Sequence, residues 1–166
     1  MGRNTLRTIL FTGLAVALSL GYLPAAQAVD CLAIPNGYNV IEGDGSDNIL
    51  VGTPGKDWIN GHGGNDTITG LDGDDILCGG SGDDSVMGDN DNDKVFGGPG
   101  RDTLDGNMGF DEVHGGADDD IEIEGGGDGD RLFGDDGDDL LQDDGGGDDE
   151  IHGGPEIGRA SCRERV

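Results

Sequence analysis

Residues 79–87 read GGSGDDSVM, and residues 97–105 read GGPGRDTLD. Both are copies of one nine-residue pattern, G-G-x-G-x-D-x-U-x, in which U is an aliphatic residue. A glycine opens each unit, an aspartate follows five residues later, and the aliphatic residue comes two residues after the aspartate. A biased composition alone would not keep glycine, aspartate and an aliphatic residue at the same spacings in successive units. The pattern therefore predicts a tandem repeat, which is the sequence signature of a solenoid.

The same phase extends from these units in both directions. The opening glycine recurs at Gly52, Gly61, Gly70, Gly79, Gly88, Gly97, Gly106 and Gly115. The aspartate recurs at Asp57, Asp66, Asp75, Asp84, Asp93, Asp102, Asp111 and Asp120. Glu122 then stands where an aliphatic residue is due, and the phase resumes one residue late at Ile123, Leu132 and Leu141, and later still at Ile151. We expect a local bulge at each of these two shifts.

This nonapeptide resembles the RTX, or haemolysin-type, calcium-binding repeat, and the resemblance covers residues 43–154. It implies an all-β fold, a right-handed parallel β-roll that calcium stabilises and in which two nonapeptides make one turn. Every second unit would then stack. One wall of the roll would bury Leu50, Ile68, Val86 and Leu104, and the opposite wall would bury Ile59, Leu77, Val95 and Val113. The chain departs from the pattern at the second and fourth glycine positions, with His62, Leu71, Asp89, Asp91, Asn107 and Asp118.

The resemblance also assigns the repeated aspartates to several bound Ca²⁺ ions. Calcium takes six to eight oxygen ligands at about 2.3 to 2.6 Å, and the loops offer aspartate carboxylates and glycine carbonyls. Aspartates of stacked units, such as Asp57 and Asp75, would flank an ion between neighbouring loops. The expected side-chain ligands are Asp57, Asp66, Asp75, Asp84, Asp93, Asp102 and Asp111, followed by Asp130 and Asp139 of the shifted units. Asp120 is left out because its unit is the least regular.

The composition makes a bound cation a structural requirement. The 166 residues include 36 glycines, and 36 acidic residues face 9 basic ones, for a formal net charge of -27. Two aliphatic side chains per turn bury too little apolar surface to offset the ordering of a glycine-rich, acidic turn. A solvated acidic surface on a disordered chain is the alternative, and we expect it for the calcium-free form. Folding would then be coupled to calcium binding. The charge excludes a nucleic-acid partner.

The two ends of the chain differ from the repeats. Residues 1–28 carry Arg3 and Arg7, a short apolar run and a small-residue site at Ala26-Gln27-Ala28, which is the layout of a secretory signal peptide. An uncleaved membrane anchor is the alternative, but the run is short for a spanning helix. We expect a secreted, extracellular protein with no membrane span after cleavage.

Residues 29–42 form an N-terminal lead-in. Residues 155–166 bring in three arginines, and the string from Glu156 resembles a translated sequencing adapter fused to a truncated reading frame; a natural basic tail is the alternative.

Cys31 and Cys78 allow two interpretations. In a secreted chain they could form a disulfide that pins the lead-in to the repeats, or they could be free thiols. Trp58, Ile76, Met87 and Phe96 flank the inward positions and should point outward. They could pack against the lead-in or form a face for self-association or for docking to a cell-surface partner.

The sequence favours a binding function over catalysis. His62, His114 and His152 are too scattered for a zinc site, and H-E-x-x-H does not occur. No nucleophilic triad has a credible scaffold, so we predict that the chain is not an enzyme. It is expected to be a secreted calcium-binding repeat protein that folds on binding Ca²⁺. The alternative is the repeat fragment of a larger secreted enzyme, toxin or adhesin whose effector domain is lost by truncation.

Overall fold

The computed structural model describes residues 31–143, 145–155 and 163–164. This part of the chain consists of strands β1 to β14 and the turns between them, with no helix. No helix that could cross a membrane is therefore present in the described residues. The predicted signal peptide lies outside them, as do residues 156–162 of the adapter-like end.

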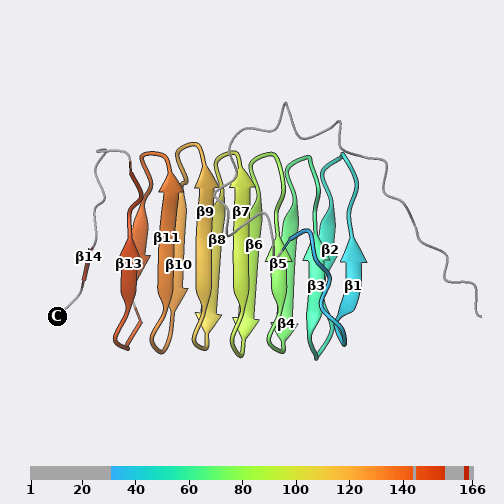
Figure 1. Cartoon of the computed structure of the whole chain (residues 1–166), viewed down its shortest axis with the longest axis horizontal. Coiled ribbons are helices and arrows are strands. Elements are labelled where there is room, and N and C mark those ends of the chain that lie inside the picture. The colour runs from blue at the N-terminus through green and yellow to red at the C-terminus, as the bar shows by residue number, and fades with distance from the viewer. Residues whose placement is uncertain (1–30, 144, 156–162, 165–166) are drawn as a thin grey trace, which may run out of the picture.

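The strands wind into a parallel β-roll of two seven-stranded sheets (Figure 1). Sheet A holds, in spatial order, β1 (Asn39–Glu42), β3 (Asp57–Asn60), β5 (Ile76–Cys78), β7 (Lys94–Pro99), β9 (Glu112–Ala117), β11 (Arg131–Asp136) and β13 (Glu150–His152). Sheet B holds β2 (Ile49–Val51), β4 (Thr67–Asp72), β6 (Ser85–Asn90), β8 (Thr103–Met108), β10 (Glu122–Gly126), β12 (Leu141–Asp143) and β14 (Arg163–Glu164). Strands pair in parallel with the strand two elements along, so two units make one turn. The predicted parallel β-roll is confirmed.

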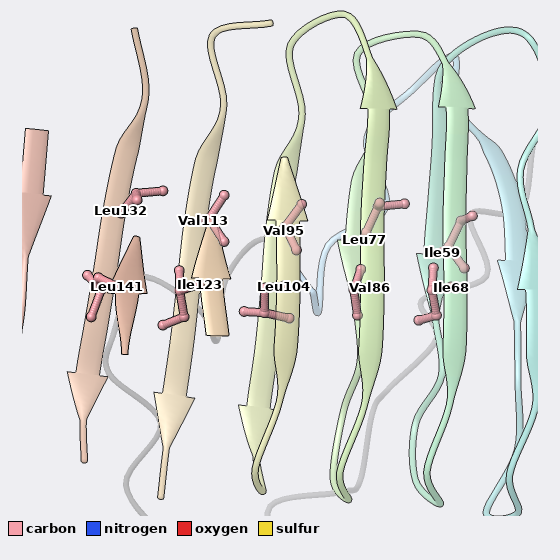
Figure 2. Packing of buried hydrophobic residues seen from close by; sticks show 10 residues of the cluster. All are labelled: Ile59, Ile68, Leu77, Val86, Val95, Leu104, Val113, Ile123, Leu132 and Leu141. Atoms are coloured by element: carbon pink, nitrogen blue, oxygen red, sulfur yellow. The ribbon is translucent and has the colours of Figure 1, made fainter. Parts of the chain in front are cut away.

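The core is a double row of aliphatic side chains between the sheets (Figure 2). The register stacks each of them on its counterpart one turn away, as Ile59 on Leu77 and Ile68 on Val86. All ten are fully buried: Ile59, Ile68, Leu77, Val86, Val95, Leu104, Val113, Ile123, Leu132 and Leu141. Leu50 packs against this row at its N-terminal end and is only partly buried. The two predicted walls are confirmed.

The glycines of a unit are needed for two different reasons. At the opening position glycine makes room: a Cβ added to Gly70 would lie 2.6 Å from Asp75 Oδ2 and 2.7 Å from the Gly88 carbonyl oxygen. At the second and fourth positions it supplies a positive φ, as at Gly80 with 111° and Gly82 with 127°. The residues that depart from the pattern keep this backbone conformation, with φ between 71° and 83° at His62, Leu71, Asp89, Asp91, Asn107 and Asp118. Stacking of the turns thus overrides the preference of these residues for negative φ.

The first phase shift is a one-residue insertion at Ile121. Glu122 pairs with Thr103 and Ile123 with Leu104, so the register there steps by one residue more than in the preceding turns. Ile121 itself is 48% exposed and lies outside the strands. The second shift falls in the loop between β12 and β13, because Leu132 pairs with Ile151. The predicted irregularities are confirmed, and both are absorbed in turns rather than in the core.

The lead-in supplies the first strand, β1, and covers the adjoining outer face of sheet A. A disulfide joins Cys31 to Cys78, with 6.0 Å between the two Cα atoms. We call the hydrophobic group beneath the lead-in the outer cluster; it consists of Trp58, Ile76, Cys78 and Phe96, with Cys31 and Tyr38 packed against them. Of the interpretations left open by the sequence, the disulfide and packing against the lead-in are the ones observed. Met87 is the exception and is 36% exposed.

Candidate metal centre

Two rows of buried aspartates line the turns between the sheets, one row along each edge of the roll. Each aspartate stands at or just before the start of a strand, because the pattern places it about two residues ahead of the inward aliphatic side chain. The first row precedes the strands of sheet A and the second row those of sheet B. All are at most 5% exposed: Asp57, Asp75, Asp93, Asp111 and Asp130 in the first row, and Asp66, Asp84, Asp102, Asp120 and Asp139 in the second.

One oxygen of each carboxylate is part of the fold's own hydrogen-bond ladder. The backbone N–H of Asp57 donates to Asp75 Oδ1 at 2.7 Å, and that of Asp66 donates to Asp84 Oδ1 at 2.7 Å. The same bond recurs along both rows up to Asp139 Oδ1, which accepts the N–H of Asp120 at 3.0 Å. Each aspartate therefore ties its turn to the preceding one without any ion.

The other oxygen faces the opening glycines and is left without a partner. In the two rows, nine such Oδ2 atoms are buried and accept no hydrogen bond: those of Asp66, Asp75, Asp84, Asp93, Asp102, Asp111, Asp120, Asp130 and Asp139. The carbonyl oxygen of the next turn's opening glycine shares the same space, as Gly88 does with Asp75 Oδ2. A buried, unpaired carboxylate is costly. This repeated pair of oxygens fits a hard cation.

Burial raises the pKa of eight of these carboxyl groups. Desolvation raises the pKa of Asp84 to about 6, that of Asp75, Asp102 and Asp111 to about 7, and that of Asp93 and Asp120 to about 8. The hydrogen bond from the backbone opposes this shift, and the charges of neighbouring aspartates add to it. Burial also raises the pKa of Asp130 and Asp139. Each group thus holds a proton more strongly than a free aspartate unless a cation takes the proton's place.

The first turn differs from the others. Both oxygens of Asp57 have donors: Thr53 donates to Oδ2 from its N–H at 2.6 Å and from its hydroxyl at 3.0 Å, and the Asn39 amide donates to Oδ1 at 2.7 Å. Asn48 stands where the second row would begin, and its Oδ1 accepts the N–H of Asp44 at 2.8 Å. The structure therefore places Asp57 in its row, as expected, but with its carboxylate already bonded.

Asp120 was missed from the sequence and belongs with the others. Its Oδ1 accepts the N–H of Asp102 at 2.9 Å, and its Oδ2 is one of the nine without a donor. The signal that could have found it is the unbroken five-residue spacing from Gly115, since the inserted residue comes only after the aspartate. The remaining expected residues lie in the two rows as predicted.

The donor set favours calcium over a transition metal. In the described segments, no three His, Cys, Asp or Glu side chains converge on one point. A cation between two loops would thus take much of its shell from backbone carbonyls, which suits Ca²⁺ and not Zn²⁺. His114 and His152 lie elsewhere, in a ring stack with Phe96 and Phe133 on the outer side of sheet A.

A parallel β-roll whose turns repeat buried carboxylates beside glycine carbonyls defines a class of protein, the calcium-binding repeat solenoids. The family model described as the RTX calcium-binding nonapeptide repeat, which holds four copies, matches residues 36–57, 51–86 and 87–122. These segments together cover more than half of the chain, and the chain belongs to this family. No curated protein and no solved structure gives a significant match.

The roll extends beyond the matched residues. Family similarity ends at residue 122, next to the insertion at Ile121, whereas the stacked strands continue from β10 to β13 with the same core and the same aspartate rows. This solenoid is a structural, calcium-binding fold and not a catalytic one. The protein is accordingly a calcium-binding repeat protein.

Proposed function

We propose that the protein is a secreted calcium-binding module that becomes ordered when Ca²⁺ fills the two aspartate rows. The observation that carries this proposal is the series of nine Oδ2 atoms in the two aspartate rows that are buried and accept no hydrogen bond in the described residues. A fold that leaves one such carboxylate oxygen in nearly every unit is strongly destabilised unless an ion neutralises them.

The proposed side-chain ligands are the nine aspartates with an unpartnered oxygen, completed by carbonyl oxygens of the opening glycines. They are Asp66, Asp75, Asp84, Asp93, Asp102, Asp111, Asp120, Asp130 and Asp139. Asp57, expected as a ligand from the sequence, is left out because Thr53 and Asn39 already donate to its oxygens. Calcium contributes charge neutralisation here and no catalysis.

Calcium binding and folding are proposed to be one coupled event. In the unfolded chain the aspartates are solvated and too far apart to hold an ion, so binding free energy becomes folding free energy. Extracellular calcium modules often have affinities of about 10⁻⁴ to 10⁻³ M, which would keep this protein unfolded at low cytosolic calcium and folded outside the cell.

The disulfide supports secretion, because such bonds persist in oxidising compartments. The layout of residues 1–28 supports export through a cleaved signal peptide.

We further propose residues 29–42 as the lead-in, 43–154 as the repeats and 155–166 as the adapter-derived end. Sequencing the locus tests the last point, since native codons for Glu156 to Val166 would refute it.

A calcium titration followed by far-ultraviolet circular dichroism tests the function. The expected result is a cooperative gain of β-structure with Ca²⁺ that Mg²⁺ at the same concentration does not produce, because Mg²⁺ demands a tighter octahedral shell. Equilibrium dialysis in parallel measures bound calcium directly. A chain that binds no calcium at about 10 mM, well above that affinity range, would refute the proposal.

A further inference from the structure

The N-terminal end of the roll satisfies its polar loops without a cation. In the first loop, Asp44 Oδ1 accepts the N–H of Ser46 at 2.9 Å and its hydroxyl at 2.6 Å, while Asn48 takes the place of an aspartate. In the second loop, Thr53 donates to Asp57. Neither loop contributes a buried carboxylate oxygen of the kind that recurs from Asp66 onward.

Next to this end, strands β3 and β5 are well packed. Strand β3 is buried on both faces, with Ile59 in the core at 0% exposure and Trp58 in the outer cluster at 3%. Farther along sheet A, the corresponding outward positions hold the charged residues Lys94, Glu112, Arg131 and Glu150. The outer cluster thus covers β3, β5 and β7, and beyond it, among the described residues, only the ring stack of His114, Phe133 and His152 continues along this face.

The disulfide adds a covalent constraint to this region. It joins residues 47 positions apart, and it ties the lead-in to β5 across β1 and β3. Closing that loop removes conformational freedom from the unfolded chain only between Cys31 and Cys78. The outer cluster and the disulfide together offset the two unpartnered carboxylates, Asp66 and Asp75, that this segment contains.

We infer that residues 31–78, which hold strands β1 to β5, form a metal-independent folding nucleus from which calcium extends the roll toward its C-terminal end. The extension step rests on the proposed function. The nucleus presents the groups on which the next turn assembles, because the N–H of Asp66 donates to Asp84 Oδ1 and that of Asp75 donates to Asp93 Oδ1. Adding a turn to a formed edge avoids a new nucleation step in a solenoid.

Hydrogen–deuterium exchange of the oxidised protein in EDTA and in Ca²⁺ tests the inference. In EDTA, amides of β1 to β5 should exchange at least about 100-fold more slowly than those of β6 to β12, because only the nucleus is ordered. Calcium should then protect β6 to β12. Trp58 is the one tryptophan of the chain and is buried in the nucleus, so its emission should change little on calcium addition.

The outcomes separate the two proposals. Uniformly fast exchange in EDTA with calcium restoring the whole roll would overturn the nucleus and leave calcium-coupled folding intact. Equal protection of all strands in EDTA would also overturn it. Protection of β1 to β5 alone, with no response of the other strands to calcium, would support the nucleus and refute the proposed function.

A matched pair of variants sharpens the test. Asn48→Asp introduces a carboxylate at the half-buried position facing Gly43 and Gly61, so β1 to β4 should lose their protection in EDTA and regain it with Ca²⁺. Asn65→Asp makes the same chemical change on the exposed side of the neighbouring loop, where its Oδ1 still accepts the N–H of Asp83. Equal losses in the two variants would indicate a general charge effect and overturn the inference.

Discussion

Asp84 is a carboxylate that the fold satisfies at one oxygen only. Its Oδ1 accepts the N–H of Asp66, and its Oδ2 is buried without a donor in the described residues. We expect Asp84→Asn to raise the calcium concentration at the folding midpoint about tenfold, because losing a charged ligand costs roughly 1.5 kcal/mol or more. A calcium titration monitored by circular dichroism measures the shift.

The adjacent Asp83 offers the control for this variant. It is exposed, and its Oδ1 accepts the N–H of Arg101 at 3.0 Å, a bond that an asparagine oxygen can also accept. Asp83→Asn changes the net charge equally and should leave the midpoint within about twofold, as expected for an exposed site. A similar shift in both variants would contradict a ligand role for Asp84.

At the level of single residues, the sequence predicted the two rows except at Asp57 and Asp120. Aspartates at constant spacing from a glycine and an aliphatic residue can occupy only one place in a stacked turn, so Asp66 to Asp111 were found from the pattern. The difference at Asp57 depends on a contact with Thr53, which stands at a position that is usually glycine. Asp120 is not evident from the pattern because the residue inserted directly after it makes its unit irregular, although its spacing from Gly115 is unchanged.

At the level of elements, the aspartate rows couple the fold to pH. Burial raises the pKa of Asp84 to about 6 and that of Asp93 to about 8, from an ordinary value of 3.8. Between about pH 4 and pH 8 the calcium-free folded state therefore binds more protons than the unfolded state. The stability that these carboxyl groups contribute is fully present below their unfolded pKa, and it is lost as the pH rises through their folded pKa values. In EDTA, we expect β-structure to increase as the pH falls from 8 to about 4.5, measured by circular dichroism.

Calcium should reverse this dependence, because protons compete with the ion for the same oxygens. At a calcium concentration near the midpoint, lowering the pH from 8 to 6 should reduce bound calcium, measured by dialysis. A calcium-free protein whose β-content falls on acidification would contradict the assignment of these buried carboxyl groups.

The one-residue insertion at Ile121 leads to a second prediction about the strands and turns. Ile121 lies between Asp120 and β10, is half exposed, and contributes nothing to the buried core row. Deleting Ile121 restores the spacing from aspartate to aliphatic residue, so calcium-dependent folding should be kept with a midpoint within about twofold of the parent, as for other exposed sites.

Deletion of Thr103 is the matched comparison. It shortens the regular stretch from Asp102 to Leu104 by one residue and turns Leu104 away from the core, because alternate residues of a strand face opposite sides. Cooperative folding in calcium should be lost for this variant alone. If both deletions behave alike in a calcium titration, the insertion is not the tolerated bulge that the register indicates.

At the level of the whole molecule, the two ends of the roll are built differently. The repeat predicted the winding, the register and the core, since each nine-residue unit contains its own turn glycines, its aspartate and its inward-facing aliphatic residue. It could not predict the path of the lead-in, which has no repeat, and so left the pairing of Cys31 with Cys78 open. The structure shows that this segment folds back over sheet A and gives the N-terminal end an apolar cover.

The disulfide should therefore stabilise the calcium-loaded roll as a whole. Replacing both Cys31 and Cys78 by serine is expected to lower the free energy of unfolding in saturating Ca²⁺ by about 2 to 4 kcal/mol, the usual cost of removing such a bond. Urea unfolding, followed by Trp58 fluorescence and by circular dichroism, measures this loss. Cys162→Ser is the control, since it removes a thiol and leaves the bond intact.

The calcium midpoint of the double variant should also rise, because the ions must then order the lead-in as well as the repeats. An unchanged midpoint would show that the lead-in and the calcium-binding turns fold independently.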